Sequence, residues 1–227
     1  MGIQERKERE REQRKAAIID CAMKVFLVKG MISATMDEIA ECAELSKATL
    51  YLYFKNKEEL ILHAIGCVLQ TFTEYLETEM ANAKSSREKI LMIGEAYLKF
   101  YHECHSQYVI LNSQDSTSGY DFSNLEIYND ILAKSNHLWR IICDPIDDAI
   151  KNGYLRKDVN SMEVAITLWS ASNGMLNLMN HVETTHLGQC HEVYVRRDDY
   201  LRKMDELDYE QLLKNLWKAI LTSYQSK

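Results

Sequence analysis

Apolar residues recur along most of this chain at the spacing of amphipathic helices. Near the N-terminus, one helix face at i, i+3, i+4, i+7 and i+8 is formed by Ile19, Ala22, Met23, Phe26 and Leu27. Gly30 ends this pattern, which predicts a first helix over about 16–29. The chain has one proline and eight glycines in 227 residues, and its Asn152-Gly153 pair follows a helical pattern rather than a hairpin one. The predicted fold class is therefore all-α.

Two short helices are predicted directly after the first one. Thr35, with Glu38 three residues later, forms a capping-box signature for a helix that runs to about Glu44. Ser46 is a natural N-cap for the next helix, which is predicted to extend through Phe54. Two short helices joined by a tight turn, with the first helix packed across them, form a helix-turn-helix.

The remaining chain is predicted to form one larger helical domain. A long apolar pattern begins near residue 57 and continues without a breaker to about residue 76. Pro145 falls within a later pattern and is expected to kink that helix. We divide the chain into a helix-turn-helix domain at 1–60, called the head, and a second domain at 61–227. Within the second domain, further helical stretches are predicted over 87–104, 106–113, 124–152, 161–186 and 207–224.

The charges of the head are unevenly placed. Residues 1–60 carry 11 Lys and Arg against 11 Asp and Glu, so the net charge of −7 arises in the second domain. No acidic residue occurs from Leu45 to Lys57, although the head as a whole is neutral. The run ERKEREREQRK at 5–15 alternates acids and bases. It is either a solvated extension of the first helix or a basic arm that grips DNA phosphates.

The helix predicted over 46–54 has a face suited to a DNA major groove. Leu50 and Phe54 fall one turn apart and form its buried side. The opposite side has small groups at its centre, which allow close approach to base edges, and hydrogen-bonding groups at its rims. Hydroxyl and ammonium groups at the rims can reach the phosphates on either side. The candidate DNA-binding residues from this argument are Lys47, Ala48, Thr49, Tyr51, Tyr53, Lys55 and Lys57.

The run ATMDEIAECAELSKATLYLYFKNKEEL at 34–60 resembles the DNA-binding domain of the TetR family of bacterial transcriptional regulators. The family pattern is T-x-x-x-I-A, a turn, and S-k-x-x-L-Y-x-x-F-x-x-K-e-x-L, and the resemblance covers about 16–61. It implies that Thr35 caps its helix and touches phosphate, that Ser46 belongs to the recognition positions, and that Lys57 contacts phosphate. Leu52 replaces the polar residue usual in the family, so it either touches a thymine methyl group or makes no DNA contact.

The segment 152–178 resembles the family's G-x-x-R-x-D…A-x-x-L-W-x-x-x-x-G segment, which opens the penultimate helix. In the family, this helix and the last helix form a four-helix dimer interface. A two-fold dimer is also what a palindromic DNA site requires. The candidate interface residues are Ala171, Ser172, Leu213, Leu216, Trp217, Ile220, Leu221 and Tyr224.

The family resemblance also implies a small-molecule pocket among the middle helices. Aromatic and thioether side chains at helical spacing are the candidates to line it, although the same pattern is typical of an ordinary core. Such a pocket favours an apolar or aromatic effector. The candidate lining residues are Tyr97, Phe100, Tyr101, Tyr108, Trp139, Trp169, Met175 and Met179.

Together these patterns predict a homodimeric repressor that binds operator DNA and is released by a small, largely apolar or aromatic ligand. The alternative is a metal- or thiol-responsive DNA-binding sensor. Its candidate residues are His102 and His105, three apart on one predicted helix, and a later group formed by His181, His186, Cys190 and His191. Because the paired C-x-x-C and H-E-x-x-H zinc patterns are absent, we predict neither a metal site nor a cofactor.

The sequence argues against an enzyme and against a membrane anchor. No nucleophile elbow, phosphate-binding glycine loop or dinucleotide fingerprint occurs. The six cysteines form no C-x-x-C pair, no signal peptide opens the chain, and no apolar run approaches the ~18 residues of a membrane span. We therefore expect a cytoplasmic protein with reduced cysteines.

Overall fold

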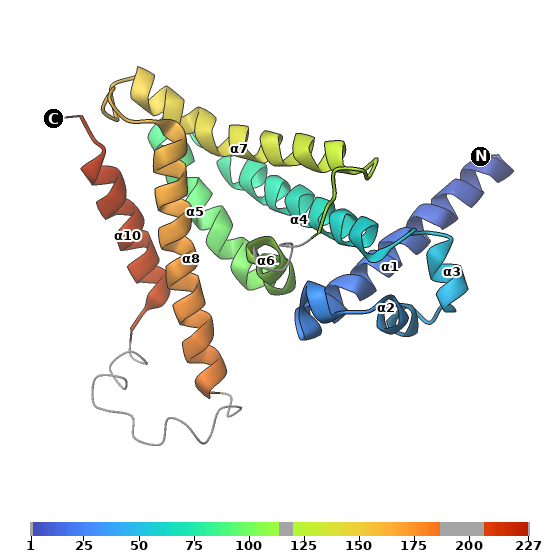
Figure 1. The fold of residues 1–227 in the computed structure, drawn as a ribbon. Helices are drawn as coiled ribbons and strands as arrows, with labels where there is room; N and C mark the ends of the chain where they lie inside the picture. Colours follow the sequence, from blue (N-terminus) through green and yellow to red (C-terminus); the bar gives the residue numbers. More distant parts are fainter. Residues whose placement is uncertain (1, 114–119, 187–206, 227) are drawn as a thin grey trace. The chain divides into compact units, whose positions relative to one another are not determined.

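The computed structural model describes residues 2–113, 120–186 and 207–226, with the side chains of 180–186 left out of the description. Within these ranges the regular elements are helices, without a β-strand, which confirms the all-α prediction (Figure 1). None of the described helices has the length and apolar content that a membrane span needs. The helices are α1 (Ile3–Ser33), α2 (Met36–Cys42), α3 (Lys47–Tyr51), α4 (Lys57–Met80), α5 (Ser86–Glu103), α6 (His105–Asn112), α7 (Tyr128–Lys151), α8 (Ser161–His186) and α10 (Tyr209–Ser223).

The chain folds as two compact units. The first unit contains residues 1–74 and 102–139, and the second contains 75–101 and 140–227. The head therefore lies wholly within the first unit, where α1 packs against both α2 and α6. Helix α4 continues from one unit into the other, since its residues up to 74 belong to the first unit and its last turns to the second.

Helix α1 is longer than predicted. It begins at Ile3 instead of about residue 16, so the charged N-terminal run is helical. Gly30 interrupts the helical path with φ 77° and ψ 156°, close to the predicted end of the helix. Glycine adopts a positive φ of this kind at little steric cost. The apolar face predicted for this helix is buried at Ile19, Ala22 and Phe26.

The later helices follow the predicted stretches closely, with one difference. Helix α7 begins at Tyr128 rather than near residue 124, because the preceding residues form turns with i→i−3 bonds such as Tyr128 N–H to the Leu125 carbonyl at 3.0 Å. Pro145 lies inside α7, as predicted. The helix ends as the Asn152-Gly153 pair predicts, because Gly153 takes φ 75° and the Tyr154 N–H returns to the Ala149 carbonyl at 2.9 Å.

Two glycines allow helices to approach closely. In the first unit, a Cβ on Gly66 of α4 would lie 2.7 Å from Ile131 Cδ1 of α7. In the second unit, a Cβ on Gly94 of α5 would lie 3.0 Å from the ring of Trp217 in α10. The Trp217 indole N–H also donates to Ser172 Oγ of α8 at 2.7 Å, so this side chain joins three helices.

Candidate nucleic-acid interface

Helix α3 has the two sides that its sequence predicts. Leu50 and Phe54 are fully buried, at 0% exposure, and form the inner side of the helix and its following turn. The outward residues are exposed at Ser46, Lys47, Ala48, Tyr51 and Leu52, while Thr49 and Tyr53 are half-buried. The structure thus brings the predicted recognition positions together on one outward face.

Helix α3 is also shorter than predicted, because it ends at Tyr51 and not at Phe54. The N–H groups of Leu52 and Tyr53 donate to the carbonyls three residues earlier in the chain, at 3.1 and 3.0 Å. These short-range hydrogen bonds tighten the last turn. At the start of the helix, Ser46 Oγ accepts the Thr49 N–H at 3.1 Å, which confirms the predicted N-cap. Leu52 and Tyr53 therefore project from a tight turn rather than from a continuing helix.

The turn between α2 and α3 is a Schellman motif built without glycine. The Leu45 N–H bonds to the Ala40 carbonyl at 2.9 Å and the Glu44 N–H to the Glu41 carbonyl at 3.0 Å. Glu44 takes φ 53°, in the left-handed region that glycine or asparagine usually occupies. A tight turn was predicted here, but its geometry was not, since nothing in a glutamate indicates a positive φ.

Lys47 is held by an acid of the preceding helix. Its Nζ lies 2.7 Å from Asp37 Oδ1 and 3.0 Å from Oδ2, and both side chains are exposed. The hydrogen bond to Asp37 raises the pKa of Lys47. Because an exposed ion pair of this kind contributes little free energy, a phosphate can replace Asp37 as the partner of Lys47.

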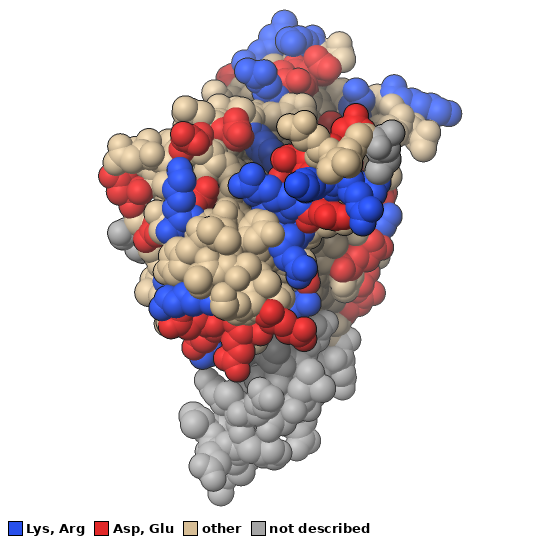
Figure 2. Space-filling model, turned by 90° about the vertical axis from the view of Figure 1, so that its right-hand side faces the viewer, with Lys and Arg blue, Asp and Glu red and all other residues tan. Residues whose placement is uncertain are grey.

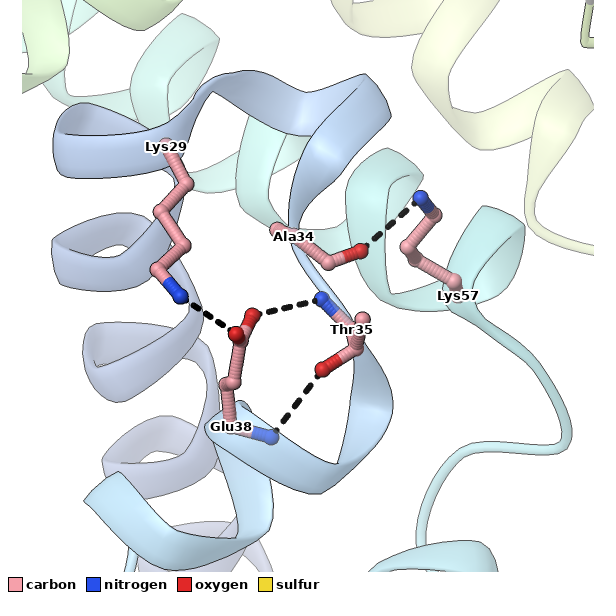
Figure 3. A network of polar contacts seen from close by, with 5 residues as sticks. All are labelled: Lys29, Ala34, Thr35, Glu38 and Lys57. Carbon is pink, nitrogen blue, oxygen red and sulfur yellow. Dashed lines mark hydrogen bonds and ion pairs between the residues drawn. The ribbon is translucent and has the colours of Figure 1, made fainter.

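A second network fixes the start of α2 (Figure 3). The Thr35 hydroxyl accepts the Glu38 N–H, and the Glu38 carboxylate accepts the Thr35 N–H at 3.0 Å, which confirms the capping box. Lys29 of α1 pairs with the same carboxylate and, together with the Thr35 N–H, lowers the pKa of Glu38. Lys57 Nζ donates to the carbonyls of Ile32 and Ala34, at 2.7 and 3.0 Å. Its ammonium group thus joins the start of α4 to the segment between α1 and α2.

We predict that Lys57→Met lowers the free energy of unfolding of the protein. The variant keeps the aliphatic stem but leaves the Ile32 and Ala34 carbonyls without their charged donor, at an expected cost of about 1–3 kcal/mol. Chemical denaturation in the absence of DNA measures this cost. Lys55→Met is the matched control, because that side chain is exposed. Equal stability of the two variants would show that Lys57 has no structural role.

The His and Cys residues of the alternative prediction form no described metal site. No group of three or more potential ligands comes together within the described residues. His102 and His105 were predicted to share a helix, which is wrong, because the chain breaks at Cys104 (φ −126°, ψ 43°) between α5 and α6. Cys190 and His191 lie outside the described residues, as do the side chains of His181 and His186.

Three of the described thiols lack the lowered pKa that is typical of reactive cysteines. Burial and a hydrogen bond with Cys42 raise the pKa of Cys21 to about 11. Burial likewise raises the pKa of Cys67 and of Cys143. A thiol with a raised pKa is mostly protonated at neutral pH and reacts slowly with oxidants. These three cysteines give the thiol-sensor alternative no support.

The predicted pocket residues divide between the two units. Tyr108 and Trp139 belong to the first unit, and the other six belong to the second. In the second unit, the Tyr97 hydroxyl of α5 donates to Asn173 Oδ1 of α8. A separate hollow of about 160 Å³ between α5 and α10 is too small for a drug-sized ligand. None of the predicted pocket residues is among those that line it, which are Leu91, Met92, Gly94, Glu95, Leu98, Leu213, Lys214 and Trp217.

Four of the eight predicted dimer residues are buried within a single chain. Helix α8 packs against α10, and this packing includes the buried residues Ser172, Leu213, Trp217 and Leu221. The other four, at Ala171, Leu216, Ile220 and Tyr224, are half-buried. The outward row of α8 instead follows i, i+4 spacing and consists of Met162, Ile166, Ser170, Gly174 and Leu178. The sequence pattern did not single out this exposed row, because it does not separate the buried side of an apolar helix from the exposed side.

The head contains two short helices, α2 and α3, each with an N-cap. Helix α3 has a buried inner side and an acid-free outer face. These features define a helix-turn-helix DNA-binding protein. Residues 18–64 match the family model described as bacterial regulatory proteins, tetR family. The chain is a TetR-family transcriptional regulator. This membership confirms the predicted resemblance and the expectation that the protein is a regulator rather than an enzyme.

Three similar proteins extend this comparison. The biofilm operon icaADBC negative transcriptional regulator IcaR of Staphylococcus aureus is 24% identical over 190 residues, or 83% of this chain and 100% of the relative. The structure of the transcriptional regulator FadR from Bacillus subtilis in complex with stearoyl-CoA matches 92% of this chain and 99% of its own, with a TM-score of 0.65 and 18% identity. The structure of AibR in complex with isovaleryl coenzyme A and operator DNA matches 72% and 83%, with a TM-score of 0.58 and 20% identity. At these identities, the likeness to the two structures establishes the fold.

Proposed function

We propose that this regulator is a repressor that binds a palindromic operator as a homodimer and leaves it when a small, largely apolar ligand binds the second domain. The observation that carries the proposal is the outward face of α3, which is exposed and free of acids. The description of IcaR as a negative regulator supports repression. The ligands named for FadR and AibR make acyl-coenzyme A thioesters, in which the acyl chain is the apolar part, the first effector class to test.

In the proposed complex, α3 enters the major groove with Ala48 and Thr49 toward the base edges. The small Ala48 allows close approach, and Thr49 offers a methyl group and a hydroxyl group. Lys47 leaves Asp37 and binds guanine or phosphate. Phosphate contacts on either side are assigned to Thr35, Ser46, Tyr51, Tyr53, Lys55 and Lys57.

The dimer is proposed to form through the outward row of α8 together with the half-buried residues of α10. Ile166 and Leu178 expose apolar surface on this row, and Gly174 between them permits close approach of a second helix. A two-fold axis through such an interface presents two α3 helices to successive major grooves, which is the arrangement a palindromic operator requires.

Helix α4 is the proposed route from ligand to DNA. It begins at Lys57, whose ammonium group is bonded to the end of α1, and it continues into the second unit. A ligand that favours a different position of α4 therefore alters the head. Ligand and DNA affinities must then be coupled reciprocally, typically by ~1–3 kcal/mol.

The test begins with selection of an operator from random DNA by the purified protein. We expect a palindromic site bound by two chains, measured by fluorescence anisotropy and by the mass of the complex. Stearoyl-CoA and isovaleryl-CoA, with free coenzyme A as the control, are then added to the complex. Release by a thioester, with a matching loss of thioester affinity on saturating DNA, supports the proposal. Selection of no sequence over random DNA refutes it.

A further inference from the structure

A groove of about 520 Å³ lies between the N-terminal part of α1 and the recognition helix, wholly within the first unit. The α3 side contributes Thr49 and the two residues of the tight turn, Leu52 and Tyr53. The α1 side contributes one acidic and three basic residues, which are Lys7, Glu10, Arg11 and Arg14. The groove therefore adjoins the face that is proposed to read DNA bases.

The N-terminal run is sorted by charge around the helix. Positions 7, 10, 11 and 14 form one helical row with three bases and one acid, while positions 5, 8, 12 and 15 form another with three acids and one base. The acid of the first row, Glu10, pairs with Arg6 at 2.8 Å. The base of the second row, Lys15, pairs with Glu12 at 3.3 Å. The side of α1 that lines the groove thus has a positive net charge, although acids and bases nearly balance over residues 5–15 as a whole.

The three basic residues of the groove are available to a ligand. No ion pair joins Lys7, Arg11 or Arg14 to an acid within the described part of the chain. Their row runs along about two turns of helix, roughly 10 Å at 1.5 Å per residue. Such a row can contact successive phosphates of one DNA strand, which lie about 3.4 Å apart along the duplex axis.

We propose that this groove holds the phosphodiester backbone of the DNA that flanks the bases read by α3. The inference rests on the proposed function, since it assigns a second contact surface to the same complex. Figure 2 views the molecule from the side that carries α3 in Figure 1, and Lys and Arg side chains lie across the middle of that face with Asp and Glu side chains among them. Arginine forks suit phosphate oxygens, and such contacts add affinity without selecting sequence.

The proposal also assigns a role to Leu52. Its side chain is 76% exposed and lines the groove beside Thr49 and Tyr53. An apolar side chain in a groove that holds a DNA strand contacts the deoxyribose between phosphates. Leu52 therefore contacts the backbone rather than a base, which is why a polar residue is not required at this position.

The test compares two triple variants with equal loss of charge on the same helix. The groove variant is Lys7→Ala, Arg11→Ala and Arg14→Ala, and the control variant is Arg9→Ala, Lys15→Ala and Lys24→Ala, none of which lines the groove or pairs with Glu10. Alanine preserves the helix, and circular dichroism with thermal unfolding verifies that both variants fold. The salt dependence of the affinity is measured on the selected operator, with and without about 10 flanking base pairs on each side.

On the flanked duplex we expect the groove variant to lose at least about 10-fold in affinity at ~0.1 M salt. Its salt slope should fall by about 5, which is roughly 0.9 for each of the six phosphate contacts that the two chains of the dimer lose. Its ranking of operator sequences should not change, and the control slope should change by less than about 1. Equal slopes for both variants, or equal losses with and without the flanks, overturn the proposal. Failure of the unmodified protein to select an operator refutes the proposed function instead, before either variant is compared.

Discussion

Replacing Ala48 by glutamate is expected to abolish operator binding while leaving the protein folded. The side chain of Ala48 is exposed on the outward face of α3, in a segment without acids. In the DNA complex, a carboxylate at position 48 would lie beside base-edge acceptors and the phosphates that border the major groove. Contacts between like charges of this kind cost several kcal/mol of binding free energy. We therefore expect operator affinity to fall at least about 100-fold, which corresponds to ~3 kcal/mol.

The Ala48→Glu variant separates DNA contact from folding. Ala48 is the second residue of α3, and an acidic side chain in the first turn of a helix interacts favourably with the helix dipole. The free energy of unfolding should therefore stay within about 0.5 kcal/mol of the original value. Ala133→Glu, at an exposed site on α7, is the matched control and should bind operator normally. Operator binding by Ala48→Glu at the original affinity would disprove the assignment of α3 as the reading helix.

Replacing Phe54 by alanine is expected to have the largest effect on stability. Phe54 is fully buried and its ring meets His63 of α4 edge-on, with centroids 5.2 Å apart. Removal of a buried phenylalanine costs about 3–5 kcal/mol. Chemical denaturation should therefore show a large loss, accompanied by loss of DNA binding. Tyr53→Ala is the control at the neighbouring half-buried position, and it should weaken DNA binding at a much smaller cost in stability. Similar stability losses for both would contradict the division into buried and outward sides.

His63 gives this variant a second readout. Burial lowers the pKa of His63 below its ordinary 6.5. The unfolded chain then binds more protons than the folded one, so stability should fall as the pH drops below about 6.5 toward the folded pKa. In Phe54→Ala, water reaches the imidazole and its pKa moves back toward 6.5. An NMR titration of His63 measures this shift directly, and an unchanged pKa would show that the ring of Phe54 does not shield it.

The features predicted correctly from the sequence are mainly local ones. The caps at Thr35 and Ser46 depend on bonds to residues three positions away, and the sequence contains both partners within one short segment. The buried pair of Leu50 and Phe54 follows from helix periodicity. The end of α3 at Tyr51 and the positive φ of Glu44 were not predicted, because the turns that follow α2 and α3 depend on how the flanking helices pack.

Contacts distant in sequence explain the other differences. Lys57 was assigned to phosphate from its charge and from the family resemblance, and the structure adds a role that could not be predicted, since its hydrogen-bond acceptors lie 25 and 23 residues earlier in the chain. The basic row of α1 could not be located from the sequence, because acids and bases nearly balance in this segment. Its position beside α3 depends on the fold. His102 and His105 had suitable spacing, yet a break in the backbone separates their helices.

The close approach at Gly66 limits how α4 can move. A Cβ at the position of Gly66 would already lie 2.7 Å from Ile131 Cδ1, so a larger side chain brought to this place would press on Ile131. Lys134 of α7 also donates to the Gly66 carbonyl at 3.4 Å. Sliding or rotation of α4 past α7 at this point therefore requires the Ile131 side chain to move aside. In the proposed repressor, a movement of α4 that keeps both contacts would tilt the helix about Gly66 or carry the start of α7 with it.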